Sequence, residues 1–168
     1  MKKLKTNQEI QIEIKRVANN INNDFKGEEI DLIALNDSPK LLINDFVKHL
    51  KLNYKCLELK FINYNNRPSS GEVKIIKDLD APAYDRNLIL VDGIIISGAT
   101  HYYLSNYLMQ SSPKSISILS IGKKPSLIKK MTPKTYTLFD FNDEMVEGYG
   151  FGSESFKTKK YLIDSNQQ

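Results

Sequence analysis

A short polar turn, Ser97-Gly98-Ala99-Thr100, follows an apolar segment that contains a single acid, Asp92. The apolar run at 87–91 is typical of a buried strand that ends on this acid, three branched apolar residues follow at 94–96, and the residues after the turn have the amphipathic pattern of a helix. A strand that leads through a turn into a helix presents several unpaired backbone N–H groups at one point. With the hydroxyls of Ser97 and Thr100 beside them, these groups predict a binding site for one phosphate group.

Strands and helices are predicted to alternate around this turn. Helices are expected over 9–25, over 39–50 with Ser38 as N-cap, and over 100–110. The inward face of the first helix is predicted to consist of Ile10, Ile14, Val17, Ala18, Ile21 and Phe25. Strands are expected over 30–35, 54–62, 73–76, 87–92, 115–121, 136–139 and 145–149. Strands that are separated by helices in this way indicate an α/β domain with a parallel sheet.

Polar segments follow several of the predicted strands, at 36–37, 63–71, 92–100 and 122–125. The carboxyl ends of parallel strands lie at one edge of the sheet, and ligands bind at that edge. We therefore expect these four segments to surround a single site.

The composition is typical of one globular domain that covers residues 1–168. Of these 168 residues, 40% are hydrophobic and 26% are charged, which allows a substantial core. No apolar run is as long as a membrane span, and the N-terminus lacks the apolar core of a signal peptide, so we expect a cytoplasmic protein with no membrane partner. The only cysteine, Cys56, has no partner for a disulfide and is predicted to be a buried structural thiol.

The chain is moderately basic, with a net charge of +4 and a pI of about 9.0. Most of its lysines are expected to be solvated at the surface, although the excess charge also favours an anionic ligand. Such a ligand would be a small phosphorylated molecule or a nucleic acid. Aromatic residues are not interleaved with the lysines, so nucleic acid is the weaker alternative.

Several segments, in their order and spacing, resemble motifs of the purine phosphoribosyltransferases, and most closely those of the hypoxanthine-guanine enzymes. Residues 87–100 are similar to the phosphoribosyl diphosphate motif of that family, and residues 70–80 are similar to the segment that precedes it. Residues 113–115, 124–126 and 143–150, the last reading Asp-Glu-Met-Val-Glu-Gly-Tyr-Gly, follow in the family's order. The resemblance covers almost the whole chain.

This resemblance implies a type I phosphoribosyltransferase fold, in which helices flank a parallel sheet and the terminal segments form a small hood. It also implies a reaction of purine salvage, in which a purine and phosphoribosyl diphosphate give a nucleoside monophosphate and diphosphate with the help of Mg²⁺. Family members form dimers or tetramers, so a homo-oligomer is expected.

The family's phosphate-binding and acidic residues are only partly present. Ser97, Gly98, Ala99 and Thr100 match its phosphate loop. Of the two acids that hold the ribose hydroxyls and metal, the first is Asp92, one methylene shorter than the usual Glu, and the second is Gly93. The position of the acid/base Asp is occupied by Ile96, which cannot exchange a proton, so no catalytic residue is intact.

On the diphosphate side the chain departs further from the family. Asn36 and Asp37 replace a basic residue and a Gly, and the carboxylate of Asp37 is expected to repel the ligand. Tyr64 is the candidate for the Ser-Tyr pair of the flexible loop. An Asp that binds metal or purine falls on Gly152, and the Arg after it falls on Thr158.

The purine pocket inferred from the resemblance has mixed chemistry. Lys124 matches the lysine that contacts the exocyclic oxygen, with Lys123 as a rival and a surface lysine as the alternative interpretation. Met145 takes the place of the stacking aromatic residue and can still cover a ring face. Val146 would read the base edge through its backbone, and Ile94 would form the opposite wall.

Two hypotheses follow for function. The first is a phosphoribosyltransferase of purine salvage with weak turnover, because each missing charged group removes a separate stabilising interaction. The second is a non-catalytic binder or regulator that recognises a nucleotide or another 5′-phosphorylated ligand through the Ser97–Thr100 loop. A role as a partner subunit is a third possibility. His101 is predicted to have a capping or surface role rather than to replace a catalytic group.

Overall fold

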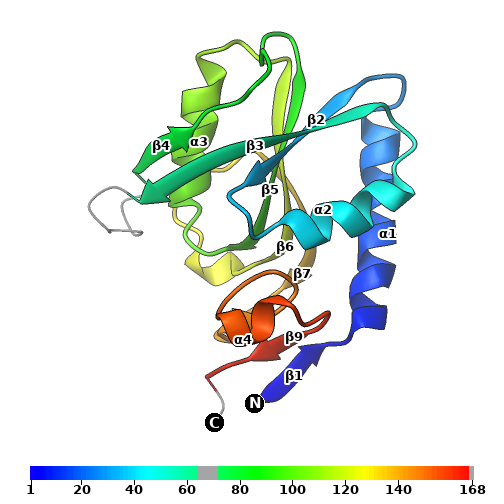
Figure 1. Cartoon of the computed structure of the whole chain (residues 1–168), viewed down its shortest axis with the longest axis vertical. Coiled ribbons are helices and arrows are strands. Elements are labelled where there is room, and N and C mark those ends of the chain that lie inside the picture. Colours follow the sequence, from blue (N-terminus) through cyan, green and yellow to red (C-terminus); the bar gives the residue numbers. More distant parts are fainter. Residues whose placement is uncertain (64–71, 167–168) are drawn as a thin grey trace.

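The central element is a six-stranded sheet in the order β4-β3-β2-β5-β6-β7 (Figure 1). In this computed structural model, residues 1–63 and 72–166 are described. The strands are β2 (Ile30–Leu35), β3 (Tyr54–Asn63), β4 (Val73–Lys77), β5 (Asn87–Ile95), β6 (Ser115–Lys123) and β7 (Lys134–Asp140). All neighbours pair in parallel except β3 and β4, which are antiparallel. The predicted α/β fold with a parallel sheet is confirmed.

Helices cover both faces of the sheet (Figure 1). They are α1 (Asn7–Asp24), α2 (Lys40–Phe46) with the 3-10 turn η1 (Val47–His49), and α3 (Ala99–Met109), while a second 3-10 turn, η4 (Pro125–Leu127), follows β6. Apolar residues of α1 and α2 pack with one face of β2 and β5, including Leu32 and Val91. Apolar residues of α3 pack with the other face, including Ile33 and Leu90. The alternation along each strand therefore serves two separate cores.

The helix starts differ in how their backbone is capped. Thr6 and Glu9 form a capping box at the start of α1, in which the Thr6 hydroxyl accepts from Glu9 N–H at 3.2 Å and the Glu9 carboxylate accepts from Thr6 N–H at 2.8 Å. The predicted inward face of α1 is buried from Ile10 to Ile21. The predicted Ser38 cap is wrong, because Pro39 occupies the cap position and no side chain bonds there.

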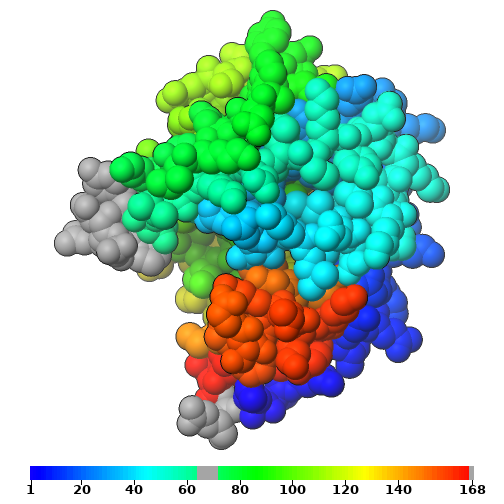
Figure 2. All heavy atoms as spheres, in the orientation of Figure 1, coloured from blue at the N-terminus to red at the C-terminus, as the bar shows by residue number. Residues whose placement is uncertain are grey.

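A small second sheet, in the order β1-β9-β8, forms the predicted hood. Its elements are β1 (Lys2–Lys5), β8 (Val146–Glu147) and β9 (Leu162–Asp164), with the short helix α4 (Glu154–Lys157) before β9. The atoms of this hood lie directly against α2 in the space-filling view (Figure 2). The hood therefore joins both ends of the described chain in one layer at the edge of the larger sheet.

A buried hydrogen-bonded group connects the hood to both neighbouring helices. The ring of Tyr149 is fully buried, and its hydroxyl donates to the carboxylate of Asp45 on α2. Gln11 on α1 donates to Asp45 at 3.0 Å and to the Tyr149 hydroxyl at 3.0 Å. Because all three groups are satisfied by one another, this polar cluster fixes the position of the hood.

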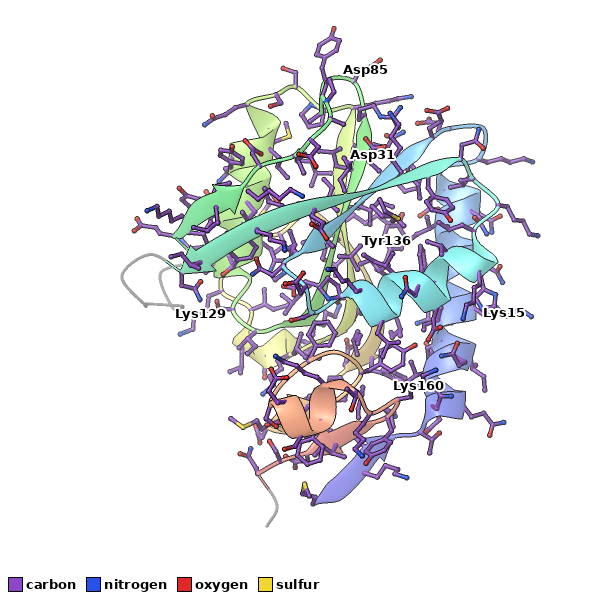
Figure 3. All side chains as sticks on the ribbon, viewed as in Figure 1. Lys15, Asp31, Asp85, Lys129, Tyr136 and Lys160 are labelled. Carbon is purple, nitrogen blue, oxygen red and sulfur yellow. The ribbon has the colours of Figure 1, made fainter. Side chains whose placement is uncertain are left out.

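The far end of the sheet is held by another buried charge. Asp31, near the start of β2, is 1% exposed and accepts both a 2.9 Å and a 2.5 Å bond from Arg86. In Figure 3, Asp31 lies at one end of the sheet, and Lys160 marks the hood at the opposite end. The hydrogen bonds that Arg86 donates to the carboxylates of Asp31 and Glu29 raise the pKa of Arg86 above its ordinary value, so the guanidinium stays charged.

Two further expectations concern exposure. Cys56 is exposed on β3, so the predicted buried thiol is wrong: the residues of this strand that face the core are Leu57, Leu59 and Phe61. Within residues 1–63 and 72–166, no helix is long and apolar enough to cross a membrane.

Candidate phosphate-binding site

A pocket of about 470 Å³ lies at the carboxyl ends of β2, β3 and β5 and at the start of α3. It is lined by Leu35, Asn36, Ser38, Phe61, Asn63, Asp92, Ile94 and the continuous stretch Ile96–His101. The parallel strands place these segments at one edge, as the sequence predicted for 36–37 and 92–100. Residues 122–125 are at the same edge, because Lys124 N–H donates to Ile95 C=O at 2.9 Å, but they do not line this pocket.

The Ser97–Thr100 turn is held in a shape that suits an anion. Gly98 has φ 77°, the left-handed region, and a Cβ there would lie 2.9 Å from Cγ2 of Thr132, so only glycine fits. The Ser97 carbonyl accepts from Lys129 and Lys130 at 3.0 and 3.2 Å, and the Ser97 hydroxyl accepts from Ala99 N–H at 3.2 Å. The N–H groups in the first turn of a helix have no carbonyl acceptor within that helix. Those of α3 that are not bonded to Ser97 can therefore bind a phosphate.

Asp92 is paired with His101, the third residue of α3. One carboxylate oxygen of Asp92 accepts from Gly93 N–H at 2.8 Å, and the other lies 2.8 Å from His101 Nε2. His101 is only 4% exposed, so the predicted surface role is wrong. Both residues contribute to the pocket wall beside the phosphate turn.

The position of the missing second acid is filled by an aromatic ring. A Cβ on Gly93 would overlap the ring of Phe151, which comes from the hood. Phe151 packs against the core cluster on the α1 and α2 face. Gly93 is therefore a small residue beneath a large one, and an acid at this position would require the ring to move.

The pocket has apolar groups where the family resemblance places polar chemistry. Ile96 is 50% exposed and, together with Ile94, lines the pocket. Neither side chain can accept a proton or a hydrogen bond. Asp92 and His101 are thus the two titratable side chains in the described pocket lining.

Asn36 and Asp37, on the diphosphate side, are both occupied by protein contacts. Asn36 has φ 62°, and its side-chain oxygen accepts from Phe61 N–H at 2.9 Å. Asp37 is paired with Lys40 at 2.8 Å and with Lys60 at 3.4 Å, and these lysines lower the pKa of Asp37 below its ordinary value. The expected repulsion of an anionic ligand is therefore partly neutralised by two adjacent lysines.

Of the four residues predicted for the purine pocket, Ile94 lines the pocket, whereas Lys124, Met145 and Val146 lie outside its lining. Lys124 is half-buried in the turn after β6, and its rival Lys123 lies 4.0 Å from Asp140. Met145 is 55% exposed, and Val146 pairs with Asp164 in the hood. The structure thus brings the phosphate loop, Asp92 and Ile94 together but leaves the other predicted purine residues outside the pocket lining.

A carboxylate lies beside Gly152, the position at which the family's Asp is missing. A Cβ on Gly152 would lie 2.6 Å from Cγ of Glu147, which comes from β8. Glu147 accepts from the Ser153 hydroxyl at 2.8 Å and from Ser153 N–H at 3.2 Å, and these bonds lower the pKa of Glu147. Tyr64 lies outside the described residues.

The described side chains do not form a ready Mg²⁺ site. Among residues 1–63 and 72–166, no group of three or more His, Cys, Asp or Glu side chains could hold a metal ion. Asp92 is the one carboxylate in the described pocket lining, and each of its oxygens already contacts a protein group, so it can accept a ligand hydroxyl but does not supply a group of carboxylates for Mg²⁺. The residues present therefore do not fit the metal implied by the resemblance, and no chemical step is assigned to it.

A parallel sheet flanked by helices, a terminal hood and a phosphate turn between β5 and α3 together define a type I phosphoribosyltransferase fold. A crystal structure of a hypoxanthine-guanine phosphoribosyltransferase from Bacillus anthracis, with HEPES in its active site, matches at a TM-score of 0.93 and 28% identity, covering 98% of each chain. Among curated proteins, the hypoxanthine-guanine phosphoribosyltransferase of Bacillus subtilis is 30% identical over 166 residues, covering 96% of this chain and 91% of that protein. The hypoxanthine phosphoribosyltransferase of Buchnera aphidicola is 30% identical over 158 residues, covering 92% and 89%. The chain belongs to the hypoxanthine-guanine phosphoribosyltransferase family, although no protein-family model matches it.

Sequence reasoning did not identify the parts played by His101, Phe151 and Glu147. The His101 spacing of nine residues from Asp92 spans a strand end and a turn, so no helical or strand period connects the two. Phe151 and Glu147 occupy the space beside Gly93 and Gly152. The one sign of this in the sequence is that each glycine falls where the family has an acid.

Proposed function

We propose that this protein binds a 5′-phosphorylated ribose compound, a nucleoside monophosphate or phosphoribosyl diphosphate, in the pocket at the Ser97–Thr100 turn. The observation that carries the proposal is the left-handed Gly98 at the start of α3, in a turn that lines a pocket together with a carboxylate. Asp92 would accept hydrogen bonds from the ribose hydroxyls. The names of the curated relatives, phosphoribosyltransferases for hypoxanthine or for hypoxanthine and guanine, support a role in purine salvage.

The reaction we propose is nucleotide formation from a purine and phosphoribosyl diphosphate with low turnover. Ile96 offers no acid or base, and Gly93 offers no carboxylate, so the reacting groups would be bound but weakly activated. Lys124, Met145 and Val146 are the residues that we expect to contact the purine. A homo-oligomer in the cytoplasm is the form we expect.

A second candidate, a non-catalytic nucleotide binder or regulator, is favoured by the ring of Phe151 over Gly93. A large apolar residue that takes the space of an acid leaves the binding turn intact while removing a group for chemistry. The two candidates share the phosphate site and differ only in turnover.

One pair of measurements decides between them. Equilibrium binding of inosine and guanosine 5′-monophosphates tests the site, and nucleotide formation from hypoxanthine, guanine or xanthine with phosphoribosyl diphosphate and Mg²⁺ tests the reaction. Thr100→Val should weaken nucleotide binding about tenfold, since a hydrogen bond to a charged group is lost. Ser111→Ala, an exposed change beyond the end of α3, is the matched control and should leave binding unchanged.

The outcomes separate clearly. Measurable binding with no nucleotide formed supports the regulator, and slow formation supports the weak enzyme. Turnover at ordinary enzyme rates of about 1–1000 per second would contradict the proposed loss of activation. Failure to bind either nucleotide would contradict the phosphate site itself.

A further inference from the structure

The Asp92–His101 pair joins the two sides of the phosphate turn through side chains. Asp92 belongs to β5 and His101 to α3, and the whole turn Ser97–Thr100 lies between them in the chain. The 2.8 Å contact between Oδ2 and Nε2 therefore closes a loop around the turn. This contact fixes the position of the Asp92 carboxylate relative to the backbone of the turn.

The imidazole has little freedom to leave this position. His101 is 4% exposed and lies on the same side of α3 as Leu104 and Leu108, which belong to the core. The His101 carbonyl also accepts from the Ser105 hydroxyl at 2.6 Å. A buried polar ring is stable only when it is hydrogen-bonded, so the ring and the carboxylate orient each other.

Gly93 N–H orients the second oxygen of the same carboxylate at 2.8 Å. A carboxylate accepts about four hydrogen bonds in total, so positions remain for hydroxyl donors of a ligand. Asp92 is half-buried and lines the pocket next to the turn, which makes those positions reachable. The plane of the carboxylate is thus set by two fixed donors before any ligand arrives.

We infer that His101 is a positioning residue, which fixes Asp92 so that the pocket distinguishes ribose 5-phosphates from inorganic phosphate and from 2-deoxyribose 5-phosphate. The inference rests on the proposed function and adds to it a source of selectivity. The turn amides bind the phosphate of all three ligands. The oriented carboxylate adds hydrogen bonds from the neighbouring 2- and 3-hydroxyls of ribose, of which 2-deoxyribose 5-phosphate lacks one and inorganic phosphate lacks both, because preorganised acceptors favour ligands that match them.

The test compares the affinities of these three ligands for the whole chain, measured by calorimetry. His101→Leu should lower the affinity for ribose 5-phosphate about tenfold and leave that for inorganic phosphate within about twofold. The reason is that the hydrogen bond that orients the Asp92 carboxylate is lost, and only the sugar contacts this carboxylate. His101→Gln, whose amide can donate from a similar position to Nε2, should restore most of the affinity. Asp92→Asn combined with His101→Leu should be no worse than either change alone, because both act through the same carboxylate.

His49→Gln is the matched control, since it changes the second of the chain's two histidines, outside the pocket on η1. It should leave all three affinities unchanged. Equal losses for phosphate and ribose 5-phosphate in His101→Leu would overturn the inference, because they indicate a damaged turn. An unchanged ratio would also overturn it. A wild-type chain that binds none of the ligands would refute the proposed function first and the inference with it.

Discussion

Single residues account for the two missing acids in different ways. Gly93 lies beneath the ring of Phe151, so the lost acid left no space, whereas Ile96 is half-exposed in the pocket wall. The same type of loss in the sequence therefore has two physical meanings. At position 93 a neighbouring ring occupies the space of an acid, and at position 96 the side chain faces an open pocket.

This difference predicts that restoring an acid will lower stability at position 93 but leave it almost unchanged at position 96. Gly93→Asp should lower the free energy of unfolding by about 1–3 kcal/mol, because its Cβ would overlap the Phe151 ring. Ile96→Asp should change it by less than about 0.5 kcal/mol, since that side chain is exposed. Denaturant unfolding of both variants checks the pair. Recovery of stability in Gly93→Asp with Phe151→Ala would attribute the loss to the ring, and equal stability of both single variants would contradict the overlap.

Among the elements, the hood is held by fewer interactions than the sheet beneath it. Its strands are two to four residues long, and its firmest polar connection is the contact of Tyr149 with Asp45 and Gln11. Burial raises the pKa of Asp45, but the hydrogen bonds from Tyr149, Lys48 and Gln11 outweigh it, so the pKa of Asp45 is lower than its ordinary value.

The lowered pKa of Asp45 predicts an acid-sensitive contribution to stability. Because the folded protein favours the ionised carboxylate, the contribution is full above about pH 4 and is lost as the pH falls through the lower folded pKa. Asp45→Asn should cost about 1.5–3 kcal/mol at pH 7 and progressively less below pH 4. Chemical unfolding at a series of pH values measures this difference. A cost that is independent of pH would show that the charge of Asp45 is not involved.

The elements that were predicted from sequence are those with a strong local pattern. The helix face from Ile10 to Ile21 and the apolar runs at 30–35 and 87–92 need only their own period to be recognised, although β5 continues to Ile95. Strands β1 and β9 were not predicted, since each is short and forms only by pairing with the other across the sequence. Likewise, the position of the phosphate turn was predicted from Ser97–Thr100, but its contact between Asp92 and His101 depends on how a strand and a helix meet.

At the scale of the whole molecule, local stability should differ between the two sheets. The large sheet has strands of five to ten residues that are packed on both faces, while the hood has a three-stranded ladder with a register shift between Lys3 and Lys5. Amide hydrogen exchange should therefore be faster in β1, β8 and β9 than in β2, β5 and β6. Mass spectrometry of exchanging peptides measures this order, and Asp45→Asn should accelerate the hood alone. Equal protection of both sheets would show that they open together.

The pairing of β1 with β9 also has a consequence for synthesis of the chain. During synthesis, β1 leaves the ribosome long before its partner β9 (Leu162–Asp164) has been made, so β1 stays unpaired over that time. Three of its four residues are lysines, and lysine on an exposed strand edge disfavours pairing with other chains. The charges of Lys2, Lys3 and Lys5 should therefore disfavour pairing of the unpaired strand with other chains until β9 has been synthesised.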